Sequence, residues 1–241
     1  MSARRNYELL VFDWDGTLAD SEAIIVQAMQ TAIQATGMPG RRAALIREVI
    51  GLGLMEAVTQ LYPRSGNREA EALAMAYRDA WLEATVQPVP LFSAAGETLK
   101  LLQSRGYLLA VATGKSRRGL NRSLMETALE DMFIASRCAD ETLSKPDPLM
   151  LNELLEELDI KPGAALMIGD TVYDMEMAAQ AGIDAVGINT GVHDRVRLLQ
   201  CQALDCLDNL GQLPGWLTGR CRRSENIKLE QPTGDRIEYD R

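Results

Sequence analysis

Residues 9–17 read LLVFDWDGT, and this stretch decides the fold class. Its first four residues are apolar without alternation, which is typical of a strand buried on both faces of a parallel sheet. The run ends at once in Asp13, Trp14 and Asp15, and Gly16 then permits a tight turn. The two-residue period of a strand predicts that Trp14 points into the core. We therefore expect a buried strand whose carboxyl end carries two acidic side chains.

Three later segments repeat the pattern of an apolar run that ends in Gly, Asp or Thr. They cover residues 107–112, 164–168 and 185–188. Between them, helical periodicity marks residues 94–104, 149–158 and 173–181, and Gly182 follows the last of these where a left-handed cap is common. The alternation of strand and helix predicts an α/β fold with a doubly wound, mostly parallel sheet.

Residues 21–85 break this alternation because they read as successive helices. Turn-forming residues separate the helices at 36–39, 51–53 and 63–67, and Pro88 and Pro90 mark the return to the sheet. We expect a helical cap at 21–87, inserted into a core formed by 1–20 and 88–218. Residues 219–241 are polar with little periodicity, which predicts a flexible C-terminal tail.

Composition limits the classes of partner. The chain has 241 residues, of which 46% are hydrophobic, so it can bury a sizeable core. A net charge of -9 disfavours nucleic acid and anionic membrane surfaces as partners. The four cysteines form no CxxC pattern and there is one histidine, so we expect reduced thiols and no zinc site. Asp13 interrupts the first apolar run too early for a signal peptide or a membrane span, which favours a cytoplasmic protein.

Asp13 and Asp15 form the first cluster that carries chemistry. An extended chain places both side chains on the same side. Two carboxylates in a partly desolvated site repel each other unless a cation neutralises them. Their hard oxygen atoms are suitable ligands for Mg²⁺. We therefore predict a divalent cation here; the alternative is a polar strand end whose carboxylates face water.

Asp170 and Asp174 form the second cluster, after the apolar run 164–168 and at the start of a predicted helix. Both can face the first pair across the carboxyl edge of the sheet, where open α/β sheets bind ligands. The alternative is structural: Asp170 as a helix N-cap and Asp174 as an exposed acid in the first turn.

Two further clusters are suited to holding an anion. Thr113 and Gly114 follow the run 107–112, and a hydroxyl beside free backbone N–H groups makes an anion-binding corner. Lys145 lies in a loop stiffened by two prolines, where it can neutralise phosphate and aspartate together. The alternative for Lys145 is a solvated surface lysine.

These four clusters, in this order, resemble the four motifs of the haloacid dehalogenase-like hydrolase superfamily. The resemblance spans about residues 9–188, and the helical insertion after the first motif resembles the first cap type. That cap type occurs in phosphoglycolate phosphatase and β-phosphoglucomutase relatives. The resemblance implies a phosphatase that acts on small phosphorylated metabolites such as phosphoglycolate or sugar phosphates.

The resemblance also implies a role for each matched residue. Asp13 is the expected nucleophile, which forms a phosphoaspartate, and Asp15 the general acid and base. Phosphate is expected at Thr113, Gly114 and Lys145. Mg²⁺ is expected at Asp13, the backbone carbonyl of Asp15, and Asp170, with Asp174 just outside the direct ligands.

Substrate choice is expected to lie in the cap. Gly51, Leu52 and Gly53 resemble the specificity loop of the cap, although an ordinary turn between two helices is an equal alternative. Lys115 is a further candidate for substrate contact. Arginines near this loop bind a second anionic group in several relatives. The nearest here, Arg47 and Arg64, do not match that position well.

Two questions stay open from the sequence, the function and the oligomeric state. A phosphomutase of the same fold is the nearest rival function, and a non-catalytic regulatory module is a rival from another class. The oligomeric state is open between monomer and homodimer. His193, in the loop after the last predicted strand, is expected to be structural rather than catalytic.

Overall fold

The computed structural model describes residues 7–219 and shows one six-stranded sheet, in which every neighbouring pair is parallel. The strand order is β3-β2-β1-β4-β5-β6. The chain begins in the middle of the sheet and builds outward in both directions, so the strand order reverses between β1 and β4, which is where open α/β sheets bind ligands. The strands are β1 (Leu9–Phe12), β2 (Leu108–Thr113), β3 (Ala135–Cys138), β4 (Ala165–Gly169), β5 (Asp184–Ile188) and β6 (Cys206–Leu207).

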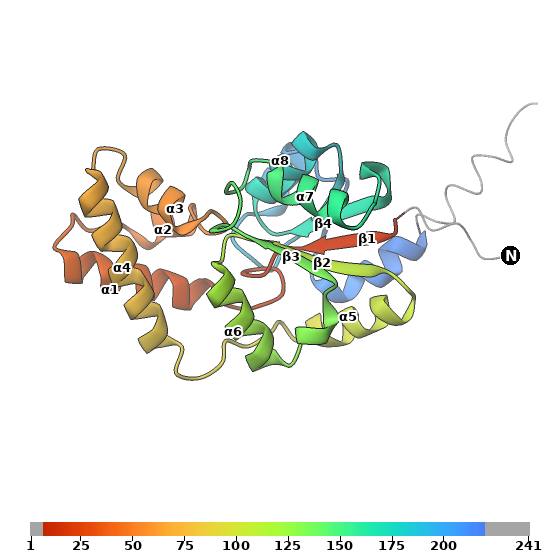
Figure 1. Cartoon of the computed structure of the whole chain (residues 1–241), viewed down its shortest axis with the longest axis horizontal. Helices are drawn as coiled ribbons and strands as arrows, with labels where there is room; N and C mark the ends of the chain where they lie inside the picture. Colours follow the sequence, from red (N-terminus) through yellow and green to blue (C-terminus); the bar gives the residue numbers. More distant parts are fainter. Residues whose placement is uncertain (1–6, 220–241) are drawn as a thin grey trace, which may run out of the picture.

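Helices cover both faces of this sheet (Figure 1). On one face lie α5 (Ala95–Ser104) and α6 (Arg117–Thr127); on the other lie α7 (Leu149–Glu157), α8 (Val172–Ala181) and α9 (Arg195–Gln200). In β1, Leu10 and Phe12 pack into the first of these cores, whereas Leu9 and Val11 pack into the second. This two-sided burial explains the unbroken apolar run, and the predicted α/β fold is confirmed.

Four helices lie between β1 and α5 and form a separate lobe beside the carboxyl edge of the sheet (Figure 1). They are α1 (Glu22–Thr36), α2 (Ala43–Arg47), α3 (Leu54–Leu61) and α4 (Asn67–Ala84). We refer to α1–α4 as the helical cap. The cap has an apolar core of its own, which includes Ile33, Val58 and Leu73. An inserted helical unit was expected from the run of successive helices in the sequence.

The two chain segments that join the cap to the sheet contact each other. After β1, Gly16 adopts a φ of +85°, and the turn closes with a hydrogen bond from Leu18 N to Trp14 O. Ala19 then pairs with Leu91 in an isolated β-bridge, and Asp20 N donates to Pro90 O. The two segments that connect the cap to the sheet are therefore hydrogen-bonded to each other.

Most predicted elements appear within a residue of their expected bounds, but β3 and β6 were not predicted. β3 reads Ala-Ser-Arg-Cys, with half-buried polar residues, and β6 has 2 residues, so neither shows an apolar run. The described structure also contains three short 3-10 turns, η1 (Glu130–Met132), η2 (Pro162–Ala164) and η3 (Leu210–Gln212), and a helical segment at 213–219. The predicted tail lies outside the described residues, apart from Gly219. Within residues 7–219, every helix is too short or too polar to cross a bilayer.

Candidate active site

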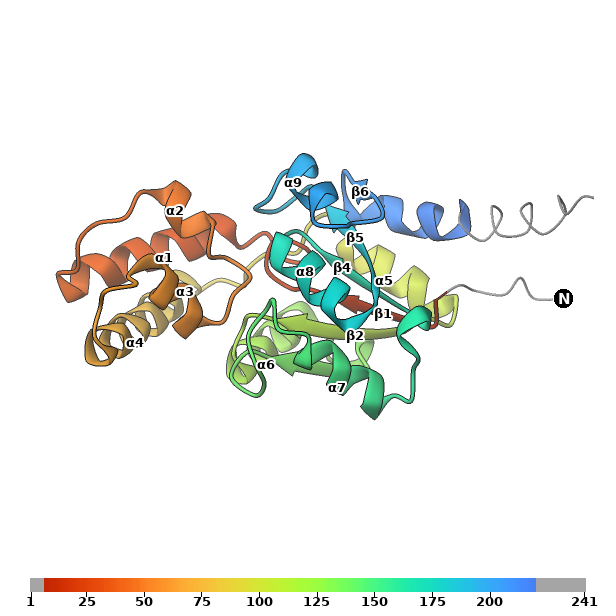
Figure 2. The ribbon, with the colours of Figure 1, turned by 90° about the horizontal axis from the view of Figure 1, so that it is seen from above.

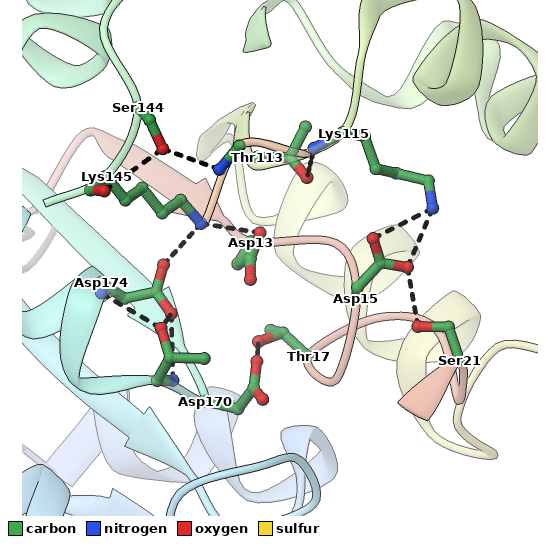
Figure 3. Close-up of polar contacts among 12 residues, drawn as sticks. Asp13, Asp15, Thr17, Ser21, Thr113, Lys115, Ser144, Lys145, Asp170 and Asp174 are labelled. Carbon is green, nitrogen blue, oxygen red and sulfur yellow. Dashed lines mark hydrogen bonds and ion pairs between the residues drawn. The ribbon is translucent and has the colours of Figure 1, made fainter. Parts of the chain in front are cut away.

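Asp13 follows β1 directly, in the middle of the carboxyl edge, and only 1% of its surface is exposed. The ammonium of Lys145 lies 2.8 Å from Asp13 Oδ1 and 2.6 Å from Asp174 Oδ1 (Figure 3). Asp13 Oδ2 has no hydrogen-bond donor among residues 7–219. Lys145 is fully buried, so the alternative of a solvated surface lysine is wrong, as is that of Asp13 facing water.

Asp170 and Asp174 lie where β4 passes into α8. Thr171 is the N-cap of α8, and it donates from its backbone N (3.1 Å) and its hydroxyl (2.7 Å) to Asp174 Oδ2. Asp170 accepts from the Thr17 hydroxyl at 2.8 Å and from Val192 N at 2.9 Å. Both acids are fully buried, so neither is the exposed first-turn acid of the structural alternative.

Three carboxylates converge at this point. Asp13, Asp170 and Asp174 each offer an oxygen within 4.8 Å of the others, yet the only ammonium that contacts them within the described structure is that of Lys145. Burial raises the pKa of Asp13, Asp174 and Asp15 add to this, and Lys145 offsets it only in part. Burial, with Asp13 and Asp174 adding to it, also raises the pKa of Asp170. The site therefore has excess negative charge, and its all-oxygen donor set fits a divalent cation such as Mg²⁺.

Asp15 departs from the expectation that it shares a cation with Asp13 through its side chain. Its carboxylate accepts from Lys115 Nζ at 2.9 and 3.0 Å, and from the Ser21 hydroxyl at 2.7 Å (Figure 3). It is not part of the three-carboxylate cluster. The reason is that β1 ends at Phe12, so the two-residue alternation of a strand no longer applies in the turn that follows.

Thr113 and Gly114 lie at the end of β2, next to the end of β1. The Thr113 hydroxyl accepts from Lys115 N at 3.2 Å, and Thr113 is buried. Gly114 packs against the cap: a Cβ at this position would lie 2.5 Å from Leu52 O and 2.6 Å from Gly51 O. The predicted anion-binding corner therefore adjoins the predicted specificity loop.

The loop Gly51–Gly53, between α2 and α3, lies across the carboxyl edge of the sheet. Gly53 N donates to the Ser144 hydroxyl at 2.7 Å, next to Lys145. A Cβ on Gly51 would lie 3.0 Å from Thr171 Cγ2, at the start of α8. The loop thus reaches the segments that carry three of the four sequence clusters.

Sequence reasoning missed a second contact between cap and core. Glu48, just after α2, accepts from Arg197 at 3.0 and 2.9 Å, and its backbone O accepts from the Tyr173 hydroxyl at 2.7 Å. His193 Nε2 lies 3.6 Å from Glu48 Oε2, while Nδ1 accepts from Val172 N. Burial lowers the pKa of His193, which favours its neutral form.

Aromatic residues of α4 form the other missed contact. The Lys115 ammonium lies 4.7 Å from the centre of the Trp81 ring, which stacks with Tyr77. A cation over an aromatic face is a favourable contact. The spacing of Lys115 and Trp81 in the sequence does not predict this contact, because only the fold brings the two residues together.

The two arginines considered for a second anionic group lie elsewhere. Arg47 forms an exposed ion pair with Glu22, within the cap. Arg64 is exposed and lines a cavity formed by cap residues only. Neither takes part in the polar contacts described above for Asp13 or Asp15.

Comparison with known proteins gives results that agree with this geometry. A family profile described as "Haloacid dehalogenase-like hydrolase" matches residues 10–188. The Dickeya dadantii (strain 3937) protein named "Probable phosphatase IndB" is 32% identical over 212 residues, which cover 86% of this chain and 92% of the relative. The phosphoglycolate phosphatase of Vibrio vulnificus (strain YJ016) is 28% identical over 219 residues, which cover 87% of this chain and 96% of the relative.

Solved structures show the same relationship. A haloacid dehalogenase-like hydrolase from Bacteroides fragilis superposes with a TM-score of 0.81 at 26% identity, covering 86% of this chain and 99% of that chain. The family match runs from β1 to the end of β5 and includes all four clusters. The resemblance inferred from the motifs is confirmed: the chain belongs to the haloacid dehalogenase-like hydrolase family.

Proposed function

We propose that the chain is a Mg²⁺-dependent phosphatase that hydrolyses small phosphate monoesters through a phosphoaspartate on Asp13. The observation that carries this proposal is the buried Asp13 carboxylate, in contact with Lys145 and beside two further acids. A carboxylate held this way is a nucleophile whose charge is offset, as phosphoryl transfer requires. The relatives named as phosphatases support the same reaction class.

In the first half-reaction, an Asp13 oxygen attacks phosphorus as the bond from phosphorus to the ester oxygen breaks. Asp15 gives a proton to that departing oxygen. Lys145 stabilises charge on Asp13 and on the transferring oxygens, with Thr113 and the backbone N of Gly114 as further donors.

In the second half-reaction, water attacks the phosphorus of the phosphoaspartate. The water gives its proton to Asp15, inorganic phosphate leaves, and the Asp13 carboxylate is restored. One group serves as acid and then as base because the second step returns the proton that the first removed. Asp15 faces the side away from Asp174, so it can reach the ester oxygen while Lys145 holds Asp13 (Figure 3).

Asp13, Asp170 and the backbone carbonyl of Asp15 are the groups that would hold Mg²⁺, with Asp174 positioned behind them by Thr171 and Lys145. When bound, the ion neutralises the excess negative charge and polarises the phosphoryl oxygens.

We also propose that residues 21–87 act as a cap over a core formed by 1–20 and 88–218. The loop Gly51–Gly53 covers the edge where phosphoryl transfer would take place, so it can exclude water and select the ester. The substrates we propose are small phosphorylated metabolites of the phosphoglycolate or sugar-phosphate type, in line with the relatives named as phosphoglycolate phosphatases.

The substitution Asp13→Asn tests the mechanism. It removes the nucleophile and should lower the Mg²⁺-dependent release of phosphate from p-nitrophenyl phosphate at least about a thousandfold. Asp20→Asn is the matched control, because Asp20 is exposed and lies in the same connecting segment. Turnover by Asp13→Asn near the wild-type rate would show that Asp13 does not carry the phosphoryl group.

A further inference from the structure

A cavity of about 730 Å³ lies between the C-terminal end of α1, the end of α3 and the start of α4. These ends lie on the side of the cap that is turned away from the sheet (Figures 1 and 2). The cavity is lined entirely by residues between Thr36 and Ala72, so it is separate from the site around Asp13.

Arginine side chains dominate the polar lining of this cavity. Arg41, Arg64 and Arg68 line it together with one carboxylate, that of Glu69. Glu69 Oε2 already accepts a hydrogen bond from Gly66 N at 3.1 Å, as part of the N-terminal cap of α4. The lining therefore has a net positive charge, although the whole chain has a net charge of -9.

None of these three arginines has a carboxylate partner among residues 7–219. Arg42, Arg78, Arg105 and Arg118 also form no ion pair there, but only Arg41, Arg64 and Arg68 line this one cavity. The other described arginines each form an ion pair with Asp or Glu: Arg47, Arg117, Arg122, Arg137, Arg195 and Arg197. In an acidic protein, three guanidinium groups around one cavity without acidic partners leave their donors available to an external anion.

Arg41 is also held in place before any ligand arrives. Its guanidinium lies 4.0 Å from the centre of the Tyr62 ring, and its Nε donates to Leu61 O at 2.9 Å. The remaining guanidinium nitrogens stay available as donors. A preorganised arginine loses less conformational entropy on binding, so it is the anchor of the lining.

We propose that this cavity binds a small polyanion, with two or more adjacent phosphate or carboxylate groups, at a site separate from the phosphatase centre. Arg41 provides the fixed donor, and Arg64 and Arg68 are exposed side chains that close on the bound anion. The volume suits a small metabolite rather than a macromolecular surface. This inference does not depend on the chemistry proposed for Asp13.

The test uses calorimetric titration of inorganic pyrophosphate, and in parallel of citrate, into the full chain in buffer free of divalent cations. Without such cations, the acidic site around Asp13 repels anions, so the measured heat of binding reports on the cavity in the cap. The wild-type protein should bind one anion per chain. Arg64→Gln/Arg68→Gln should weaken binding at least about tenfold, since each lost charge-assisted hydrogen bond is worth that much or more.

Arg78→Gln/Lys100→Gln is the matched control, because it removes two exposed charges outside the cavity. It should bind like wild type, and both double variants should keep wild-type turnover of p-nitrophenyl phosphate. Tighter binding of pyrophosphate would assign the site to phosphate compounds, and tighter binding of citrate to polycarboxylates. Equal affinity in wild type and Arg64→Gln/Arg68→Gln, equal weakening in the control, or no saturable binding by wild type would each overturn the proposal.

Discussion

At the residue scale, Asp15 shows how a side chain can be held by partners from distant parts of the chain. Lys115 contacts both of its carboxylate oxygens, and Ser21 donates to one of them. Lys115 is in turn covered by Trp81 from the cap. Both Asp15 oxygens thus accept from protein donors, which fix the orientation of the carboxylate. Lys115 therefore sets where the proposed acid and base sits.

Lys115→Met should reduce catalysis in a way that depends on the leaving group. For an alkyl phosphate, whose departing oxygen needs a proton, we expect kcat/KM to fall at least about tenfold. For p-nitrophenyl phosphate, whose leaving group departs without a proton, the loss should be clearly smaller. Lys100→Met, an exposed lysine of α5, serves as the control. An equal loss with both substrates would contradict a role that acts through Asp15.

At the element scale, Gly114 makes a close contact with the backbone of the loop Gly51–Gly53. A Cβ on Gly114 would lie 2.5 Å from Leu52 O, which is shorter than real contacts allow, and the obstacle is backbone rather than a flexible side chain. Only glycine lets the end of β2 meet the cap this closely.

Gly114→Ala should therefore hold the cap slightly open. A displacement of about 1 Å near the reacting groups can cost on the order of a hundredfold in rate, so kcat/KM should fall by up to that amount while the protein stays folded. Gly163→Ala is the matched control, since nothing lies within 4 Å of its Cβ position. Unchanged kinetics in Gly114→Ala would mean that this contact is not needed for turnover.

Glu48 links the cap to α8 and α9 on the other side of the same opening. Its ion pair with Arg197 is partly exposed on both sides, so Glu48→Gln should lower the free energy of unfolding by less than about 1 kcal/mol. The local effect should be larger. Amide hydrogen exchange should become faster in the loop Gly51–Gly53 and in the connecting segments.

Glu22→Gln is a suitable comparison for this variant, because it breaks an ion pair that lies within the cap. It should leave exchange in the loop Gly51–Gly53 unchanged. If Glu48→Gln and Glu22→Gln gave the same exchange pattern, Glu48 would not hold the cap against the core.

At the scale of the whole molecule, the excess negative charge at Asp13, Asp170 and Asp174 links metal binding to folding. Mg²⁺ that binds only the native state should stabilise it, by about 2.7 kcal/mol at a concentration one hundred times its Kd. Asp170→Asn should remove most of this gain. Without Mg²⁺, the same variant should be at least as stable as wild type, because it removes one of three mutually repelling buried carboxylates.

Chemical unfolding of both proteins, with Mg²⁺ and with a chelator, measures these differences directly. An equal Mg²⁺-induced gain in wild type and Asp170→Asn would place the ion elsewhere. Asp184→Asn is a useful comparison, since Asp184 lies at the opposite end of its strand, away from the carboxyl edge.

The predictions from sequence succeeded where a signal is local. The run Leu9–Phe12 is buried on both faces, as its lack of alternation indicated. Thr171 caps α8 close to the expected start, so Asp170 and Asp174 both face Asp13. β3 was missed because an edge strand with polar residues has no apolar run, and β6 because it is too short to show a period.

By itself, the sequence determined the α/β fold, the inserted helices and the family, and it predicted that Asp170 and Asp174 face Asp13 and Asp15 at the carboxyl edge of the sheet. These features can be recognised from hydrophobic periodicity and from motifs a few residues long. Both kinds of signal depend on the geometry of the backbone over a few neighbouring residues. Only the tertiary structure decided that Asp15 turns to Lys115, that Glu48 meets Arg197, and that unpaired arginines line one cavity of the cap. Such contacts join separate elements, and they depend on packing and charge in three dimensions, which spacing along the chain does not encode.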